Sequence, residues 1–270
     1  AACSCTRKGG ASAAPSATAA SKPDIKVGVA LSLTGVGNAY GPVQKNGVNL
    51  AADRINAAGG ANGAKLQLVI EDDQSTTDGG ITAFTKVVQQ DRVAAALGPA
   101  PPGTAVAAAP AAQSAQTPVI AISNTGEGIV GKCSYGPCDY VFRVSLGESA
   151  AIPETVKTVK AKLSLKSVVL MYAQDDKFSS DGFVIFKKAL ESNAIAVKKE
   201  IAYSKNDVDL SGPVTQALAE TPDAIVNSSL AGPAIKILQE VAKRKPGLPV
   251  IGGNVSFYNE SFGKAIYPTP

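Results

Sequence analysis

Apolar positions form short β-prone runs and longer stretches with helical spacing, and the two alternate along most of the chain. Residues Ile25–Leu31 are an apolar run with no polar face, which predicts a strand covered on both sides. Small and apolar residues recur at helical spacing over 43–55, and Gly59 and Gly60 end that predicted helix because glycine readily adopts the left-handed conformation of a C-terminal cap. Residues 65–70 form the next predicted strand, which completes one βαβ unit.

The same alternation predicts two lobes, each built on a doubly wound parallel sheet. In the first lobe we expect further strands at 93–97 and 118–123, which makes four in all, and helices at 78–90 and 103–116. The extended segment 140–145 is expected to make the first crossing between the lobes. In the second lobe the predicted strands are 167–172, 196–202, 224–228 and 249–252, and the predicted helices are 151–163, 180–192, 209–220 and 233–243. The prediction is an α/β fold of two Rossmann-like lobes, 24–145 and 146–270, around a ligand cleft.

Polar residues gather after the predicted strands. In open α/β sheets, ligands bind outside the carboxyl ends of the strands, so the loops that follow the strands are the candidate site. These loops are residues 32–41, 99–104, 123–125, 173–178, 228–231 and 252–256.

The order of the segments also resembles a known family. The chain contains, in sequence, VGVALSLTGVGNAYG, GVNLAADRINAAGG, KLQLVIEDDQS, ALGPAPPGTAVAAAP, TPVIAISNT, YVFRVS and PVIGGNVSF. These segments resemble the extracytoplasmic solute-binding proteins of ABC importers, and most closely the Leu/Ile/Val-binding, type 1 periplasmic binding protein family. The resemblance implies a monomer without a cofactor or enzymatic activity, which closes on a small molecule and delivers it to a membrane permease.

Site residues carry over from the family position by position. Tyr40 would form an aromatic wall in the first lobe, and Phe178 stands where a second-lobe tyrosine is common. Ser123, Asn124 and Thr125 would offer hydroxyl and backbone groups to the polar end of the solute.

The chain departs from the family at three of these positions. Pro102, which precedes Gly103 and Thr104, replaces the serine that holds the solute's carboxylate. Asn254 replaces the acid that pairs with the solute's ammonium, and Leu230 replaces a usual aromatic residue. Because a buried ammonium without a counter-ion is costly, we expect a neutral amide, a small carboxylate or an aromatic acid rather than a simple zwitterionic amino acid. Glu127, Asp175 and Asp176 are the acids that could substitute.

Composition excludes several other classes. The chain has no histidine and no GxSxG or SxxK motif, which removes the usual general base and nucleophile pairs. Its net charge is +4, the lysines lie on predicted helix faces, and tryptophan is absent, so nucleic acid is not the expected partner.

One glycine motif supports a rival interpretation. Residues Gly126 to Lys132 match GxGxxG and GxxxxGK, which would suit a nucleotide-binding α/β enzyme. Both motifs need a helix to begin at the last glycine, and the following CSYGPCDY leaves no room for one. A ligand sensor on the same fold remains a further alternative.

The four cysteines indicate an extracytoplasmic location. Cys133 and Cys138 bracket a turn-prone SYGP, and a disulfide there would contribute roughly 2 kcal/mol; two free thiols are the alternative. AACSC at the start resembles the end of a bacterial lipoprotein signal, with Cys3 as the lipid anchor, Cys5 as a weaker candidate and 1–23 as a flexible tether. A chance fragment of a signal region is the other interpretation.

Because family members continue past the equivalent of Pro270, we also expect a C-terminal truncation that leaves the first lobe incomplete.

Overall fold

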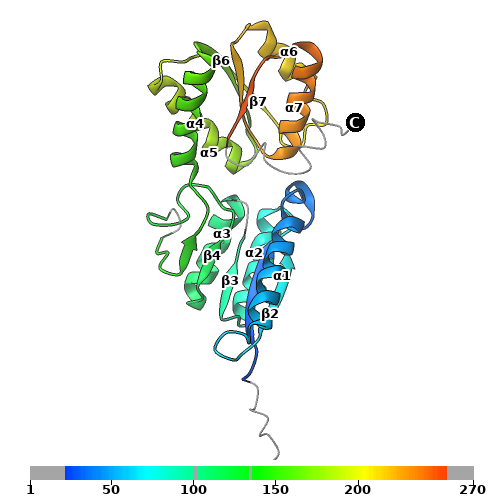
Figure 1. The fold of residues 1–270 in the computed structure, drawn as a ribbon, viewed down its shortest axis with the longest axis vertical. Helices are drawn as coiled ribbons and strands as arrows, with labels where there is room; N and C mark the ends of the chain where they lie inside the picture. Colours follow the sequence, from blue (N-terminus) through cyan, green and yellow to red (C-terminus); the bar gives the residue numbers. More distant parts are fainter. Residues whose placement is uncertain (1–21, 100–101, 134–135, 254–270) are drawn as a thin grey trace, which may run out of the picture.

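The computed structural model describes residues 22–99, 102–133 and 136–253. They form two α/β lobes stacked along the long axis of the molecule (Figure 1). The strands of the first sheet are, in order across the sheet, β2 (Leu66–Asp72), β1 (Ile25–Leu31), β3 (Ala95–Leu97), β4 (Val119–Ala121) and β5 (Val141–Arg143). Those of the second sheet are β7 (Ala196–Tyr203), β6 (Ser167–Ala173), β8 (Ala224–Ser228) and β9 (Val250–Gly252). Every pairing between these strands is parallel. The strand order and the parallel pairing confirm two doubly wound sheets.

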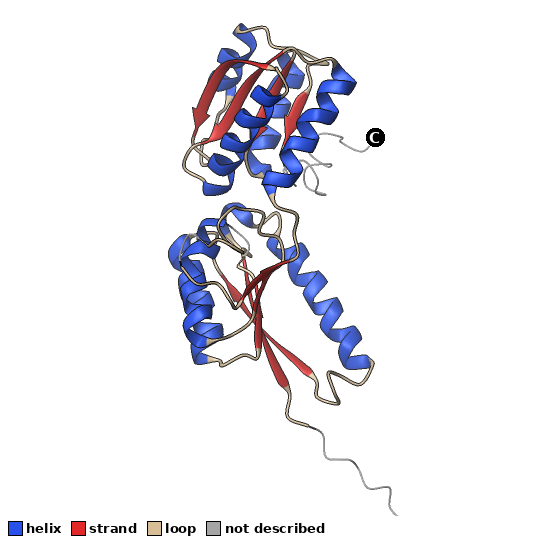
Figure 2. Cartoon of the chain, turned by 90° about the vertical axis from the view of Figure 1, so that its left-hand side faces the viewer, coloured by secondary structure: helices blue, strands red, loops and turns tan. Residues whose placement is uncertain are grey.

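The first lobe places helices on both faces of its sheet (Figure 2). Ala30 of β1 and Ala96 of β3 face α2 and α3, where they pack in one cluster with Phe84 and Val87. Helix α1 lies on the opposite face, against β1 and β2. The elements of this lobe are β1 (Ile25–Leu31), η1 (Gly35–Gly37), α1 (Gly41–Ala57), β2 (Leu66–Asp72), α2 (Thr77–Thr85), η2 (Lys86–Gln90), β3 (Ala95–Leu97), α3 (Pro102–Ala115), β4 (Val119–Ala121) and β5 (Val141–Arg143).

The second lobe buries its sheet on both faces. Strand β6 (Ser167–Ala173) is an almost continuous apolar run, as a central parallel strand requires. Helices α4 (Glu148–Leu163) and α5 (Lys177–Ser192) pack on one face around Phe186, and α6 (Ser211–Ala219) and α7 (Ala231–Arg244) pack on the other around Ile237. The remaining strands are β7 (Ala196–Tyr203), β8 (Ala224–Ser228) and β9 (Val250–Gly252).

The structure differs from the prediction at three elements. Residues Val141–Arg143 are a fifth strand of the first sheet, paired with β4, and the chain crosses to the second lobe after it, through 144–147. Helices α4 and α5 each begin three residues earlier than predicted, and Asp176 caps α5 by accepting a hydrogen bond from the backbone N–H of Ser179 at 2.9 Å. Within the described residues, no helix combines the length and apolar character needed to cross a membrane.

Candidate ligand-binding site

The carboxyl ends of the two sheets face each other, and a cleft of about 570 Å³ lies between them. Loops after β1 and β2 and the first turn of α3 form one wall, and loops after β6 and β7 form the other. The lining residues are Gly35, Val36, Gln74, Ser75, Thr76, Thr77, Gly103, Thr104, Asp175, Asp176, Lys177, Lys205 and Asn206. Both lobes therefore contribute polar groups to one site, at the place where parallel sheets bind ligands.

Asp72 fixes the first-lobe wall. Its Oδ1 accepts a hydrogen bond from the N–H of Leu33 at 3.0 Å, and its Oδ2 accepts one from Oγ1 of Thr34 at 2.6 Å. Ser75 Oγ donates to the carbonyl oxygen of Thr34 at 2.6 Å and accepts from the N–H of Gly37 at 2.9 Å. Burial raises the pKa of Asp72, but the hydrogen bonds that it accepts outweigh burial and lower the pKa overall. Asp72 therefore positions the loops after β1 and β2.

Acidic residues organise the second-lobe wall. Asp176 caps α5, and Lys177 pairs with Asp181 one turn later at 2.8 Å. Asp175 accepts hydrogen bonds at 2.7 Å from the Ser204 hydroxyl and from the N–H of Lys205. The carboxylates of Asp175 and Asp181 are thus committed to partners within this lobe.

Tyr40 joins the two lobes. Its phenolic oxygen accepts a hydrogen bond from the backbone N–H of Ala231, the first residue of α7, at 3.1 Å. The first N–H groups of a helix have no partner within the helix, so this bond satisfies one of them. Burial raises the pKa of Tyr40, and the phenol stays neutral at physiological pH.

A buried polar network supports the loop that ends at α7. Tyr203 Oη donates to Oδ1 of Asn227 at 2.7 Å, and the amide of Asn227 donates to Oγ of Ser229 at 2.7 Å. Burial is the main cause of the raised pKa of Tyr203. The network holds Ser229 and Leu230 in place where Tyr40 contacts the helix.

The crossing between the lobes carries a buried acid. Glu148 begins α4, is 1% exposed, and donates its N–H to the carbonyl oxygen of Thr125 at 3.1 Å. Burial raises the pKa of its carboxyl to about 8, and the negative charges of Asp181, Glu127 and Asp176 raise it further. The Oε2 atom of Glu148 has no hydrogen-bond partner.

The predicted site residues divide into three groups. Gly103 and Thr104 line the cleft, and Tyr40 bridges the lobes as described above. Asn124 and Thr125 are buried beside the crossing, where the Ser145 hydroxyl donates to the carbonyl oxygen of Asn124.

Ser123, Phe178 and Leu230 are not among the residues that line the cleft. The Ser123 hydroxyl accepts a hydrogen bond from Nε2 of Gln44 at 2.8 Å, on the side of the sheet that carries α1. Phe178 is buried in the first turn of α5, and Leu230 is the half-buried N-cap of α7. Pro102 is the first residue of α3, and Asn254 and Cys3 lie outside the described residues.

Several cleft residues were not expected from the sequence. Gln74 to Thr77, Lys205 and Asn206 follow β2 and β7, and the rule that ligands bind at the carboxyl ends of strands would have included both loops. Glu148 had no such signal, because an acid at a helix start is ordinarily an exposed partner of the helix dipole.

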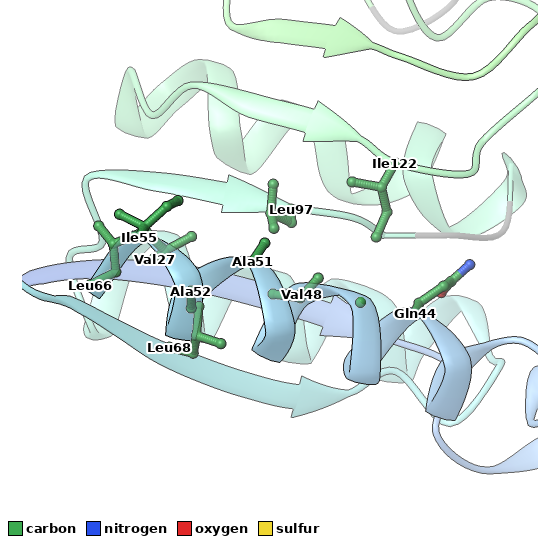
Figure 3. A pocket seen from close by; sticks show the side chains of 11 residues that line it. Val27, Gln44, Val48, Ala51, Ala52, Ile55, Leu66, Leu68, Leu97 and Ile122 are labelled. Atoms are coloured by element: carbon green, nitrogen blue, oxygen red, sulfur yellow. The ribbon is translucent and has the colours of Figure 1, made fainter. Parts of the chain in front are cut away.

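A second cavity, of about 390 Å³, lies within the first lobe between α1 and the sheet. Figure 3 shows that the side chains around it are apolar except for Gln44. They include Val48 and Ala51 of α1 and Leu68, Leu97 and Ile122 from the sheet side. This lining offers a polar solute almost no hydrogen bonds, so the cleft between the lobes is the candidate site.

The glycine motif has no phosphate-binding geometry. Residues 127–132 form turns and bends, and the described residues on either side, 126, 133 and 136–140, contain no helix. Glycine amides therefore do not open a helix there, which argues against the nucleotide-binding alternative. The structure joins Cys133 and Cys138 by a disulfide across this loop. Within the described part of the chain, no group of three His, Cys, Asp or Glu residues is placed to hold a metal ion.

Two α/β lobes with a polar cleft between opposed strand ends define a solute-binding protein of the two-lobed class. The profile of the periplasmic binding protein family matches residues 24–265. The chain therefore belongs to the periplasmic binding protein family, and its fold is that of the type 1 members.

Two similar proteins illustrate this relationship. The Leu/Ile/Val-binding protein BraC3 of Rhizobium johnstonii is 40% identical over 83 residues, which cover 31% of this chain and 22% of that protein. The chain thus aligns with about a fifth of this curated relative. The LivJ substrate-binding protein of Streptococcus pneumoniae, solved in complex with isoleucine, superposes with a TM-score of 0.83 at 28% identity, over 90% of this chain and 68% of LivJ.

A third similarity concerns the fold alone. A solute-binding protein of an ABC transporter from Rhodopseudomonas palustris, in complex with 3,4-dihydroxybenzoic acid, has a TM-score of 0.73 at 23% identity. The aligned part covers 85% of this chain and 61% of that protein.

Proposed function

We propose that this protein captures a small polar solute between its lobes and presents it to the permease of an ABC importer. The observation that carries the proposal is the cleft, where polar loops from both lobes meet at the carboxyl ends of two parallel sheets. Contacts to both lobes exist only when the lobes are closed, so binding shifts the population toward the closed form. The Tyr40–Ala231 hydrogen bond is a direct contact between the two lobes.

The proposed solute is amino-acid-like or a small organic acid. LivJ and BraC3 support the amino-acid class through their names, and the complex with 3,4-dihydroxybenzoic acid shows that an aromatic acid is bound on this fold. Asn254, in place of the acid that pairs with an ammonium, favours a solute without an amino group, and Pro102, in place of the serine that holds a carboxylate, is compatible with a neutral amide.

The proposed setting is the outer face of the cytoplasmic membrane or the periplasm. We place a lipid on Cys3, a tether over 1–23 and the two lobes over 24–145 and 146–270, and we expect a monomer. The small residues before Cys3 and the Ala-, Ser- and Gly-rich segment after it support the anchor and the tether.

A thermal-shift screen tests the proposal. The panel contains the twenty amino acids, their amides, aliphatic acids and hydroxybenzoic acids, each at millimolar concentration. Because a ligand that binds only the folded state stabilises it by mass action, one chemical class should raise the Tm by several degrees. A cooperative melt that no compound shifts would contradict solute binding of this kind.

A further inference from the structure

Lys205 is a charged residue of the cleft that the contacts within the fold leave uncommitted. It follows β7 and lies in the wall that the second lobe contributes to the cleft. Its side chain is half-buried, and within the described part of the chain its ammonium forms no ion pair or hydrogen bond. A positive charge that is partly withdrawn from water favours an anion that enters the cleft.

The backbone of Lys205 is held in a braced turn. Asp175 accepts hydrogen bonds from the Lys205 N–H and from the Ser204 hydroxyl, each at 2.7 Å. Asp207 accepts a hydrogen bond from the N–H of Ser204 at 2.9 Å, and Lys236 of α7 donates to the carbonyl oxygen of Asp207 at 2.8 Å. Because these bonds fix the turn before a solute arrives, less conformational entropy is lost when the lysine binds it.

The other charged side chains of the cleft lining already have partners. Lys177 forms a two-point ion pair with Asp181, at 3.0 and 2.8 Å. Each carboxylate oxygen of Asp175 accepts one of the hydrogen bonds described above. Oδ2 of Asp176 caps α5 by accepting two hydrogen bonds, at 2.9 and 2.7 Å. Among the described lining residues, Lys205 is therefore the charged group that is left for a solute.

The opposite wall offers hydrogen-bond donors and no charged side chain. Every described residue that the first lobe contributes to the lining is uncharged, so no carboxylate of that lining faces Lys205 across the cleft. Gly103 and Thr104 lie in the first turn of α3, where backbone N–H groups have no partner within the helix and carry partial positive charge. A Cβ at Gly103 would lie 3.7 Å from Cβ of Lys177 in the other lobe, so one small solute can contact both walls.

From this arrangement we infer that Lys205 pairs with a carboxylate of the solute and makes the cleft selective for organic acids that carry no ammonium group. This inference rests on the proposed function and deepens it, because it chooses one of the solute classes named there. An ammonium in the same cleft would have to compete with the bonds that Asp175 and Asp176 already make. The neutral Asn254, where the family resemblance implies an acid, agrees with this choice.

Calorimetry with matched acids and amides tests the inference. The probes are 4-methylpentanoate and 4-hydroxybenzoate, the uncharged amide of each, and L-leucine, which is 4-methylpentanoate with an added amino group. At least one acid should bind the wild-type protein about tenfold or more tightly than its amide, and leucine should bind more weakly than that acid.

Two substitutions of Lys205 separate its charge from its shape. In Lys205→Met the affinity for the acid should fall about tenfold, while the affinity for the amide stays within about threefold. Lys205→Arg keeps the positive charge and should bind the acid within about threefold of the wild type. Added salt should weaken acid binding more in the wild type than in Lys205→Met, because it screens the pair of charges.

Lys188→Met is the matched control, because it removes an exposed positive charge from α5 of the same lobe, outside the cleft lining. It should leave all affinities unchanged. Acid binding that Lys205→Met does not weaken, an equal loss for acid and amide, or tighter binding of an amide or leucine to the wild type would overturn the inference and leave solute binding intact. Binding of none of these probes to the wild-type protein would instead contradict the solute classes of the proposed function, and this inference with them.

Discussion

Replacing Glu148 with glutamine is expected to change how the stability of the fold responds to pH. In the unfolded chain the carboxyl titrates near its ordinary pKa of 4.5, whereas in the fold, where the side chain is 1% exposed, burial and the neighbouring acids raise the pKa to about 8. A group whose pKa is raised by folding makes its full contribution to the free energy of unfolding below the unfolded pKa, and loses that contribution as the pH rises to the folded pKa. The wild-type protein should therefore lose stability through this window.

The magnitude follows from the two pKa values. Each pH unit between 4.5 and about 8 lowers the free energy of unfolding by about 1.4 kcal/mol, which gives about 5 kcal/mol over the whole window. Between pH 5 and pH 8 the expected loss is about 4 kcal/mol. Glutamine does not titrate, so Glu148→Gln should gain this amount relative to the wild type as the pH is raised.

Urea unfolding at pH 5 and pH 8 measures the effect. The free energy of unfolding of Glu148→Gln minus that of the wild type should rise by about 4 kcal/mol, because all other titrating groups are common to both proteins. Glu154→Gln, at a position that is 73% exposed, should show no such change. Parallel pH profiles for Glu148→Gln and the wild type would refute the account of a buried, unpartnered carboxyl.

Three further substitutions test the packing around the cleft. Tyr40→Phe removes the acceptor of the Ala231 N–H, so hydrogen exchange of that amide should accelerate about fivefold, as expected for a loss of about 1 kcal/mol; unchanged exchange would contradict the interlobe bond. Gly80→Ala would place a Cβ 1.7 Å from Cγ2 of Thr104, so urea unfolding should show a loss of about 1–3 kcal/mol, and a neutral effect would refute this packing. Tyr203→Phe leaves the buried Oδ1 of Asn227 without its donor, so the free energy of unfolding should fall by about 1–3 kcal/mol. A thermal melt should show this as a lower Tm, and an unchanged Tm would contradict the buried hydrogen bond.

Sequence periodicity predicted the strands well because the parallel sheets are buried on both faces. The central strands Ile25–Leu31 and Ala224–Ser228 have the predicted bounds, since each is an apolar run ended by polar residues. Val141–Arg143 was mistaken for a linker, because a three-residue edge strand with Phe142 exposed has no distinctive pattern. The early start of α5 was missed because Asp176 is a cap, which the apolar pattern alone does not identify.

The candidate site was less predictable than the fold. The position of a strand end indicates which loops approach the cleft, and Gly103 and Thr104 were found in this way. The position of a strand end does not indicate which way each side chain points. The Ser123 hydroxyl contacts Gln44 and Phe178 lies in the interior, and neither position was predicted. The burial of Glu148 depends on residues such as Gly182 of α5 and Gly253 after β9, which meet only in the folded lobe.

The central claim is that the solute binds in the cleft between the lobes. It is tested most directly by measuring how tightly the best solute from the thermal-shift screen binds a variant in which a large side chain fills this cleft. Gly103 lines the cleft, and tyrosine at this position should occupy it; Gly212→Tyr is the control, because Gly212 is an exposed glycine of α6 with no neighbour within 4 Å of its Cβ position. Calorimetry should show saturable one-to-one binding to the wild type and to Gly212→Tyr, and at least about a hundredfold loss in Gly103→Tyr. Unchanged affinity in Gly103→Tyr would contradict the assignment of the interlobe cleft as the solute site.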